Sequence, residues 1–285
     1  MITACLVIYH EEKKIKDCLE QLNGIVDEIL IVHDGECYDQ SIQIAKQYAD
    51  KIFIREHIGI AEPHRAFLYQ QAKGDFILIL DADECFSWQL KNFLKNKQFN
   101  FDALRVPWWE ENNDTIIKRN FYKLIFFRKE KMHFIGFPQA EAFTSGSIKT
   151  MENCPLINKP GFSNYSMKSW QKQKKWIKVH AHYYVKELSA IPSFQFDSFF
   201  NAWKKKHAFR IRWPFLFFSC KAAFIFSKNL FSFSKNYRHN FSLAIIACYY
   251  YLLLGCSVTI LKLRRFFRKD RPENYNKQSK NKTNK

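Results

Sequence analysis

The chain has 285 residues, of which 47% are hydrophobic and 25% charged, so it can bury a sizeable core. Its formal net charge of +18 is uneven: residues 1–162 carry −3 and residues 163–285 carry +21. The basic half therefore predicts an anionic partner, either lipid or nucleic acid. The eight cysteines form no C-x-x-C pair of the metal-binding type.

The cysteines also bear on the cellular compartment. Cys5, Cys248 and Cys256 lie inside apolar runs and are typical of small buried hydrophobic side chains. The sequence starts with a strand-like segment at residues 2–8 rather than with a signal-peptide pattern. We therefore expect a reducing, cytoplasmic compartment.

The first hundred residues alternate between predicted strands and helices. Apolar runs predict strands at residues 2–8, 27–32, 51–54 and 77–80. Helical spacing predicts helices at residues 15–22, 41–48 and 63–73, and a fourth helix that Ser87 caps. This alternation is typical of an α/β fold with a parallel sheet covered by helices.

Acidic side chains follow two of these strands. Asp34 follows the second, and Asp81 and Asp83 follow the fourth. Because Asp81 and Asp83 are two residues apart, an extended backbone points both side chains to the same side. Paired carboxylates suit a hard divalent cation, and ligands bind at the carboxyl ends of strands in such sheets. The sequence thus predicts a Mg²⁺ or Mn²⁺ site with Asp81 and Asp83 as ligands.

Glycine-rich phosphate loops are missing from the sequence. Neither G-x-G-x-x-G nor G-x-x-x-x-G-K-[ST] occurs, which argues against a dinucleotide-binding fold or an ATPase. If a nucleotide diphosphate binds at this edge, the acidic cluster and its cation must hold it.

The ordered set of these residues resembles family 2 glycosyltransferases with the GT-A fold, with Asp81-Ala82-Asp83 as the DXD motif. The matching pieces are His10-Glu11-Glu12, Asp34 with Asp39, Arg65, Ala72-Lys73-Gly74-Asp75 and the DXD motif. The similarity is good over residues 1–100 and looser to about residue 190. The chain is most similar to bacterial enzymes of the lipopolysaccharide-core β-glucosyltransferase type. It departs from the pattern at His10, where Asn is usual, and at Cys37-Tyr38, where Ser-Thr is usual.

The resemblance implies a role for each strand-end residue. Asp34 is expected to accept a hydrogen bond from the base, uracil N3–H, and Asp39 to hold its loop or touch the nucleotide. Asp81 is expected to contact the ribose or a water molecule bound to the metal, and Asp83 is expected to ligate the cation. Arg65 is expected to pair with phosphate or with one of the acids.

Inversion at the anomeric carbon, which the resemblance also implies, needs a carboxylate base. The candidates downstream of the DXD motif are Glu110, Glu111, Asp114 and Glu141. The usual His-Glu pair is not intact in residues 134–141, and we take Glu141 as the catalytic base. Pro107-Trp108-Trp109 is a candidate aromatic platform for an acceptor sugar.

The basic half, residues 163–285, has a different composition. Lysines alternate with tryptophans over residues 168–178, which favours an amphipathic helix in which His180 and His182 are hydrogen-bonded rather than metal-bound. Residues 240–261 carry no charge and are long enough to span a bilayer. Basic residues flank this segment on both sides, so we favour interfacial or re-entrant helices, pairing residues 215–233 with 240–261. A true span and a buried soluble helix are the alternatives.

The sequence therefore predicts three segments and one activity. The segments are a GT-A domain at residues 1–190, a basic helical membrane-associating region at 191–269, and a disordered tail at 270–285. The expected enzyme uses a metal to transfer a sugar from a nucleoside-diphosphate sugar, with UDP expected, to a lipid-linked or cell-envelope glycan. We expect it on the cytoplasmic face of the inner membrane. A nucleic-acid-binding protein and a non-catalytic relative are the alternatives.

Overall fold

The computed structural model describes residues 1–112, 115–159, 167–186, 190–230 and 237–269. The chain forms two compact units. One comprises Met1–Lys172 and Glu187–Lys204, and the other Gln173–Lys186 and Lys205–Lys285. The division into residues 1–190, 191–269 and 270–285 stays a prediction, and the last of these segments lies outside the described residues.

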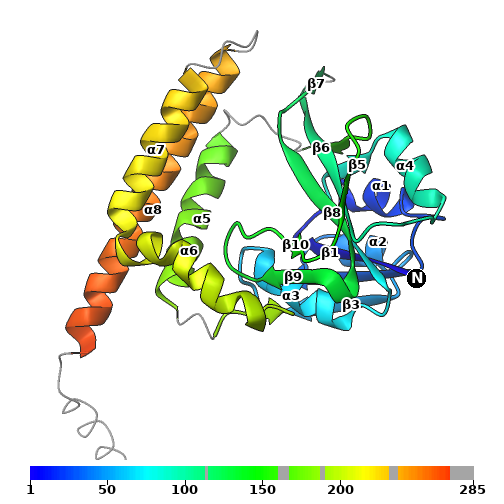
Figure 1. Ribbon diagram of the computed structural model, residues 1–285, viewed down its shortest axis with the longest axis horizontal. Coiled ribbons are helices and arrows are strands. Elements are labelled where there is room, and N and C mark those ends of the chain that lie inside the picture. The colour runs from blue at the N-terminus through cyan, green and yellow to red at the C-terminus, as the bar shows by residue number, and fades with distance from the viewer. Residues whose placement is uncertain (113–114, 160–166, 187–189, 231–236, 270–285) are drawn as a thin grey trace, which may run out of the picture. The chain divides into compact units, whose positions relative to one another are not determined.

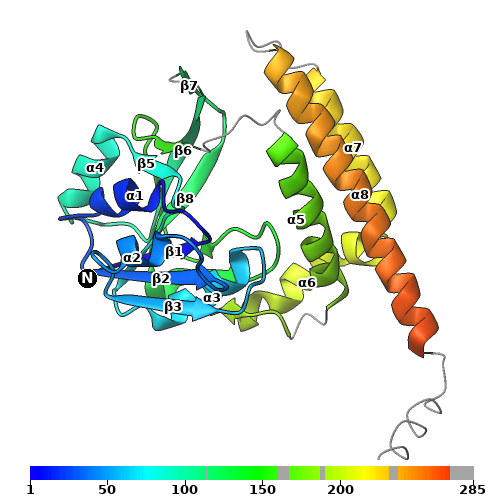
Figure 2. The same ribbon diagram turned by 180° about the vertical axis from the view of Figure 1, so that it is seen from behind.

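Four parallel strands form one side of the large sheet in the first unit (Figures 1 and 2). They are β1 (Ile2–Ile8), β2 (Glu28–Asp34), β3 (Lys51–Arg55) and β4 (Phe76–Ile79). Their order in the sheet is β3-β2-β1-β4, and each pairs in parallel with its neighbour. These are the four strands that the apolar runs predict. Because the four strands are parallel, their carboxyl ends all lie on the same side of the sheet, where the strands end.

Helices cover both faces of these strands. They are α1 (Ile15–Glu20), α2 (Ser41–Ala45), α3 (Glu62–Gln71) and α4 (Trp88–Lys95). The apolar residues of α1, α2 and α4 share one buried cluster, and those of α3 belong to the cluster on the opposite face. Ser87 Oγ accepts a hydrogen bond from Leu90 N at 3.3 Å, which confirms the predicted helix cap.

The sheet continues through strands that the sequence pattern did not predict. They are β8 (Tyr122–Arg128), β6 (Ala103–Asn112), β12 (Leu156–Asn158) and β5 (Glu84–Phe86), with β7 (Thr115–Ile117) and β11 (Ile148–Thr150) paired to β6. β8 runs antiparallel to both β4 and β6. The result is a mixed, mostly parallel sheet flanked by helices, which confirms the predicted α/β, GT-A-like class.

A small second sheet packs beside α3. It contains β10 (Phe143–Thr144), β9 (Met132–Ile135) and β13 (Ser193–Phe194), with short 3-10 helices η1 (Lys129–Lys131) and η3 (Asp197–Phe199) nearby in sequence. Gly136 follows β9, and a Cβ there would lie 2.9 Å from Pro192 O and 3.0 Å from Pro63 Cα. Glycine therefore allows the chain after β9 to approach the start of α3 closely.

The second unit is helical. Its elements come from α5 (Met167–Val185), α6 (Phe200–Arg212), α7 (Pro214–Leu230) and α8 (Tyr237–Lys269), the first two being shared with the first unit. α7 and α8 lie side by side (Figures 1 and 2). A Cβ at Gly255 would lie 3.2 Å from Phe218 Cβ, so this glycine allows close packing of the two helices. The pairing of two apolar helices is thus confirmed, although residues 231–233 lie outside the described part.

One segment of α8 has the length and composition of a membrane span. It covers Ile245–Arg265, and in the described ranges no other helix meets both conditions. Leu252, Leu253 and Ile260 on this helix are exposed. Because core helices of soluble proteins can have the same length and composition, the interfacial, re-entrant and spanning arrangements all stay predictions.

Candidate functional site

The strand-end acids are brought together by the first turns of α3. Asp34 ends β2, and Asp81 and Asp83 lie in the turn between β4 and β5. His64 and Arg65 are consecutive on α3 and contact different acids: His64 Nε2 lies 2.8 Å from Asp34 Oδ1, and Arg65 donates to Asp81 Oδ1. One helix thus fixes the carboxyl ends of two strands relative to each other.

Asp81 lies between two cations. Arg65 contacts its Oδ1, and Lys123 Nζ on β8 lies 3.0 Å from its Oδ2. Burial would raise the pKa of Asp81, but the adjacent Arg65 and Lys123 hold the pKa of this carboxyl below its usual range. The expected pairing of Arg65 with one of the acids is present in the structure.

Glu84 belongs to the same cluster and is only 1% exposed. Lys123 Nζ lies 2.6 Å from its Oε1, Trp108 Nε1 donates to the same oxygen at 2.8 Å, and Asp81 N donates to Oε2 at 2.9 Å. Burial raises the pKa of Glu84. This residue therefore fixes the backbone of the acidic turn, and Trp108, predicted as a sugar platform, supports it.

Asp83 is the acid of the turn with the longer ion-pair contact, although its side chain is about as exposed as that of Asp81, at 34%. The side chain of Asp83 is 31% exposed, and its ion-pair partner is Lys14 Nζ at 3.8 Å, longer than either contact of Lys123. Burial and the nearby charge of Asp81 raise the pKa of Asp83, while Lys14 lowers it. An added cation would relieve both of the effects that disfavour the ionised carboxylate.

Asp34 is buried, and both of its oxygens accept hydrogen bonds. Ile58 N donates to Oδ1 at 2.6 Å and Gly59 N to Oδ2 at 2.8 Å, in addition to the contact with His64. Burial would raise the pKa of Asp34, but these hydrogen bonds hold the pKa below its usual range. Asp34 therefore also fixes the chain between β3 and α3.

Asp39 holds the loop between β2 and α2. Its Oδ1 accepts from Ser41 N at 3.0 Å and from Cys37 Sγ at 3.2 Å, and its Oδ2 accepts from Glu12 N at 3.4 Å. Burial would raise the pKa of Asp39, but these hydrogen bonds lower it to about 2. Of the two roles expected for Asp39, holding the loop is visible in the structure.

His10 and Tyr38, which both depart from the family pattern, contact each other. His10 has a positive φ of 53° and stacks on Tyr9 with ring centroids 4.1 Å apart. Tyr38 N donates to His10 Nε2 at 3.4 Å. The histidine in the first turn and the altered loop after β2 thus belong to one local arrangement.

The four base candidates have different surroundings. Glu110 is buried and paired with Arg119, and Glu111 Oε2 lies 3.1 Å from Lys159 Nζ. Asp114 lies outside the described residues. Glu141 is exposed, and its side chain has no hydrogen bond or ion pair to the parts of the chain that the structure describes. The segment that carries it is tied to α3, since Gln139 N donates to Glu62 Oε1 at 2.7 Å.

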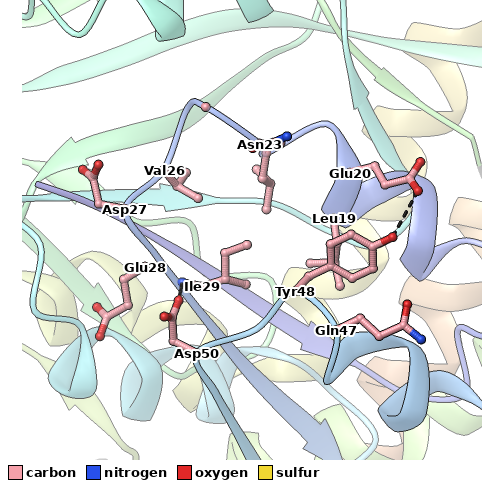
Figure 3. Close-up of a pocket in the computed structure, with 12 residues that line it drawn as sticks. Leu19, Glu20, Asn23, Val26, Asp27, Glu28, Ile29, Gln47, Tyr48 and Asp50 are labelled. Atoms are coloured by element: carbon pink, nitrogen blue, oxygen red, sulfur yellow. Dashed lines mark hydrogen bonds between the residues drawn. The ribbon is translucent and has the colours of Figure 1, made fainter.

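A pocket of about 700 Å³ lies elsewhere on the first unit (Figure 3). Residues from the end of α1, the start of β2 and the segment after α2 line it, and Tyr48 donates to Glu20 Oε1 at 3.0 Å. The start of β2 is the opposite end of this strand from Asp34. The pocket therefore belongs to the amino ends of the strands and not to the acidic site.

The His180-x-His182 pair on α5 is hydrogen-bonded within the second unit, as expected. His180 Nδ1 contacts the hydroxyl of Tyr250, and His182 Nδ1 lies 2.8 Å from Lys178 O. Burial lowers the pKa of His180 to about 4. A metal site at this pair is not needed to explain the two histidines.

Comparison with known sequences identifies one family. The family model described as Glycosyl transferase family 2 matches residues 3–148, just over half of the chain. An uncharacterized glycosyltransferase of Rickettsia typhi is 24% identical over 130 residues, which cover 46% of this chain and 40% of that protein. One of Rickettsia felis is 30% identical over 91 residues, covering 32% and 31%. The matched part thus spans about two fifths or less of these relatives.

The solved structures of two proteins show weaker likeness. The structure of S. aureus TarS 1–349 in complex with UDP-GlcNAc has a TM-score of 0.47 at 14% identity, covering 94% of this chain and 91% of that one. The mannosyltransferase PcManGT from Pyrobaculum calidifontis, in complex with GDP-Man and Mn²⁺, has a TM-score of 0.47 at 14% identity, covering 92% and 87%. Likeness at this level assigns neither substrate nor metal.

Proposed function

Because this chain belongs to glycosyl transferase family 2 and is therefore a glycosyltransferase, we propose that it takes its sugar from a nucleoside-diphosphate donor, with UDP as the nucleotide. The observation that carries this proposal is the turn after β4, in which Arg65 and Lys123 fix Asp81 while the contact of Asp83 with Lys14 is longer, at 3.8 Å. A diphosphate needs cationic partners, and this turn combines two cations with a partly exposed carboxylate.

The acidic turn fits a divalent cation. Asp83 offers a partly exposed oxygen ligand whose ion pair with Lys14 is long, at 3.8 Å, and Asp81 is the second candidate ligand. Mn²⁺ and Mg²⁺ both prefer such oxygen ligands. When bound, the ion would neutralise charge that develops on the leaving nucleoside diphosphate.

Other residues of the chain would position the acidic turn and the nucleotide. Arg65 and Lys123 keep Asp81 ionised and in place. Asp34 ends β2, where Ile58, Gly59 and His64 hold its two oxygens and His57 Nδ1 lies 3.2 Å from Oδ2; in the proposed complex it accepts a hydrogen bond from uracil N3–H. Asp39 keeps the neighbouring loop in position for the nucleotide.

Glu141 is our proposal for the base that takes the proton of the acceptor hydroxyl in an inverting transfer. Gly136 and Gln139 hold its segment against the start of α3, whose next turn carries Arg65 to the acidic turn. The exposed carboxylate of Glu141 can move to meet an acceptor. Glu62 is the alternative in the same place, since burial raises its pKa.

The surface of the second half of the chain is the basis for the acceptor that we propose. Exposed lysines on α6 and exposed apolar side chains on α7 and α8 suit an anionic membrane surface, at which a lipid-linked glycan would be presented. We therefore propose a glycan or glycolipid of the cell envelope, such as a lipopolysaccharide core, as the acceptor. The enzyme would act from the cytoplasmic face of the membrane.

Thermal-shift measurements with a panel of nucleotide sugars test the proposal. The wild-type chain is heated with each donor, with and without Mn²⁺, beside the Asp83→Asn variant. Asp75→Asn is the matched control, because Asp75 is exposed and pairs with the amino terminus instead.

A UDP-sugar at 100 times its Kd should raise the Tm by about 5 °C or more in the presence of Mn²⁺. Asp83→Asn should lose this metal-dependent shift, whereas Asp75→Asn should keep it. If none of the nucleotide sugars raises the Tm of the wild-type chain, the proposed donor class is wrong.

A further inference from the structure

A second group of metal-ligand side chains lies in the loop after β2. One nitrogen of His33, Cys37 Sγ and a carboxylate oxygen of Asp39 all lie within 4.8 Å of one another. His33 is fully buried, and the other two side chains are half-buried. The three residues come from a short stretch of the first unit, and none of them belongs to the Asp81–Asp83 turn.

The hydrogen bonding of His33 is the pattern expected of a metal ligand. Its Nδ1 lies 2.8 Å from Gly35 O, and because a carbonyl oxygen can only accept, Nδ1 carries the proton. Nε2 of the neutral ring is then left with a free lone pair. This atom is buried and has no hydrogen-bond partner in the described part of the chain.

A buried nitrogen without a partner is costly, so a native structure needs a reason for it. Metal-bound histidines commonly donate their other N–H to a backbone carbonyl, which is the arrangement of His33 and Gly35. The pairing of an occupied Nδ1 with an unpartnered Nε2 therefore points to an ion at Nε2.

Cys37 and Asp39 supply the other two ligands. Cys37 Sγ donates to Asp39 Oδ1 at 3.2 Å, so the thiol and the carboxylate already face each other. Ser41 N and Glu12 N hold the carboxylate in place. A cation that replaced the thiol proton would keep both side chains near their present positions.

We propose that His33, Cys37 and Asp39 bind a zinc ion. A set of one nitrogen, one sulfur and one oxygen suits Zn²⁺, whereas the carboxylates of Asp81 and Asp83 suit Mg²⁺ or Mn²⁺. Binding forms three coordinate bonds to the protein and releases the thiol proton of Cys37 to solvent. Zinc would cross-link the end of β2 to the loop that leads into α2.

Cobalt spectroscopy of the full-length chain tests this site. Co²⁺ stands in for Zn²⁺ and gives a thiolate charge-transfer band, and excess Mg²⁺ occupies the Asp81–Asp83 turn. The variants are Cys37→Ser and His33→Asn, whose amide can replace the Nδ1–H bond to Gly35 but has no counterpart of Nε2. Cys85→Ser and Asp83→Asn are the controls.

The wild-type chain should bind one Co²⁺ with a thiolate band that Zn²⁺ removes. Cys37→Ser should lose the band, and His33→Asn should bind Co²⁺ about 100-fold more weakly or worse. Both controls should keep it. Absence of the band in the wild-type chain, its survival in Cys37→Ser, or its loss in either control overturns the proposal.

A measurement on the wild-type chain covers the case of a variant that fails to fold. Zn²⁺ should lower the rate of Cys37 alkylation by iodoacetamide about tenfold or more, as followed by mass spectrometry of its peptide. The same rate with Zn²⁺ and with a chelator would show that the thiol does not bind the ion.

Discussion

The ammonium of Lys123 lies 2.6 Å from the buried carboxylate of Glu84, and the same ammonium lies 3.0 Å from Asp81. Asp81 lies in the turn after β4 and Glu84 is the first residue of β5, while Lys123 comes from the middle of the sheet on β8. The antiparallel half of the sheet therefore supplies the cation that holds the acidic turn of the parallel half. Asp83 is left with a longer ion pair, to Lys14 at 3.8 Å.

Replacing Lys123 with Met should destabilise the protein strongly. Glu84 would keep a buried charge without its cation, which costs about 3–5 kcal/mol in the free energy of unfolding. Lys97→Met is the matched control, because Lys97 also lies 2.6 Å from its acid, Asp27, but both side chains are about 40% exposed. Its expected cost is below about 1 kcal/mol. Equal costs in urea unfolding would contradict this description of the cluster.

Acid unfolding should depend on Asp34. The pKa of Asp34 is lower in the folded state than in the unfolded chain, so its contribution to stability is present above the ordinary carboxyl pKa of about 4 and is lost as the pH falls. Asp34→Asn should cost about 2 kcal/mol or more at pH 7, because an amide cannot accept from both Ile58 and Gly59.

The difference between wild type and Asp34→Asn should shrink as the pH is lowered from about 5 to 2. Denaturant unfolding at several pH values measures it, with the exposed Asp17→Asn variant as the control. A difference that is constant across this range would show that the ionised form of Asp34 has no special role.

Local patterns were sufficient to predict the front half of the fold. Apolar runs identified β1 to β4, and a capping serine identified the start of α4. The acids at the strand ends followed from the same reasoning, since a run of buried residues that ends in carboxylates needs a cation nearby.

The rest of the site depends on contacts between distant parts of the chain. Lys123 is separated from Asp81 by 42 residues and acts through the pairing of β8 with β4, which no local pattern specifies. Trp108, whose role as a sugar platform stays a prediction, donates to Glu84 because β12 lies between β6 and β5 in the sheet. The partners of Asp34 come from the chain between β3 and α3, which carries no strand or helix pattern of its own.

The catalytic base can be identified by measuring kcat and the donor KM separately for glutamate variants. Glu141→Gln should lower kcat by about 10²–10⁴-fold and leave the donor KM unchanged, since a base acts on the acceptor proton. Glu130→Gln is the matched control, being an exposed glutamate of the same region. If Glu141→Gln keeps the wild-type kcat and Glu62→Gln loses it, the base is Glu62.

Membrane association should depend on the exposed lysines of α6. Replacing Lys204, Lys205 and Lys206 with Gln should weaken binding to anionic vesicles about 100-fold, at about 1 kcal/mol for each lost charge. The control replaces the exposed lysines of the first unit, Lys13, Lys16 and Lys46. Flotation with vesicles measures both. Binding to RNA but not to vesicles at moderate salt would favour a nucleic-acid partner instead.

Turnover of a nucleotide sugar by the Asp83→Asn variant tests the central proposal most directly. Wild type, Asp83→Asn and Asp75→Asn are compared with Mn²⁺ and the donor that gives the largest thermal shift. Asp83→Asn should lose about 10²–10³-fold or more of the wild-type rate while staying folded, and Asp75→Asn should keep that rate. An Asp83→Asn rate within about twofold of wild type would contradict the proposed role of this carboxylate in holding the donor diphosphate through a metal ion.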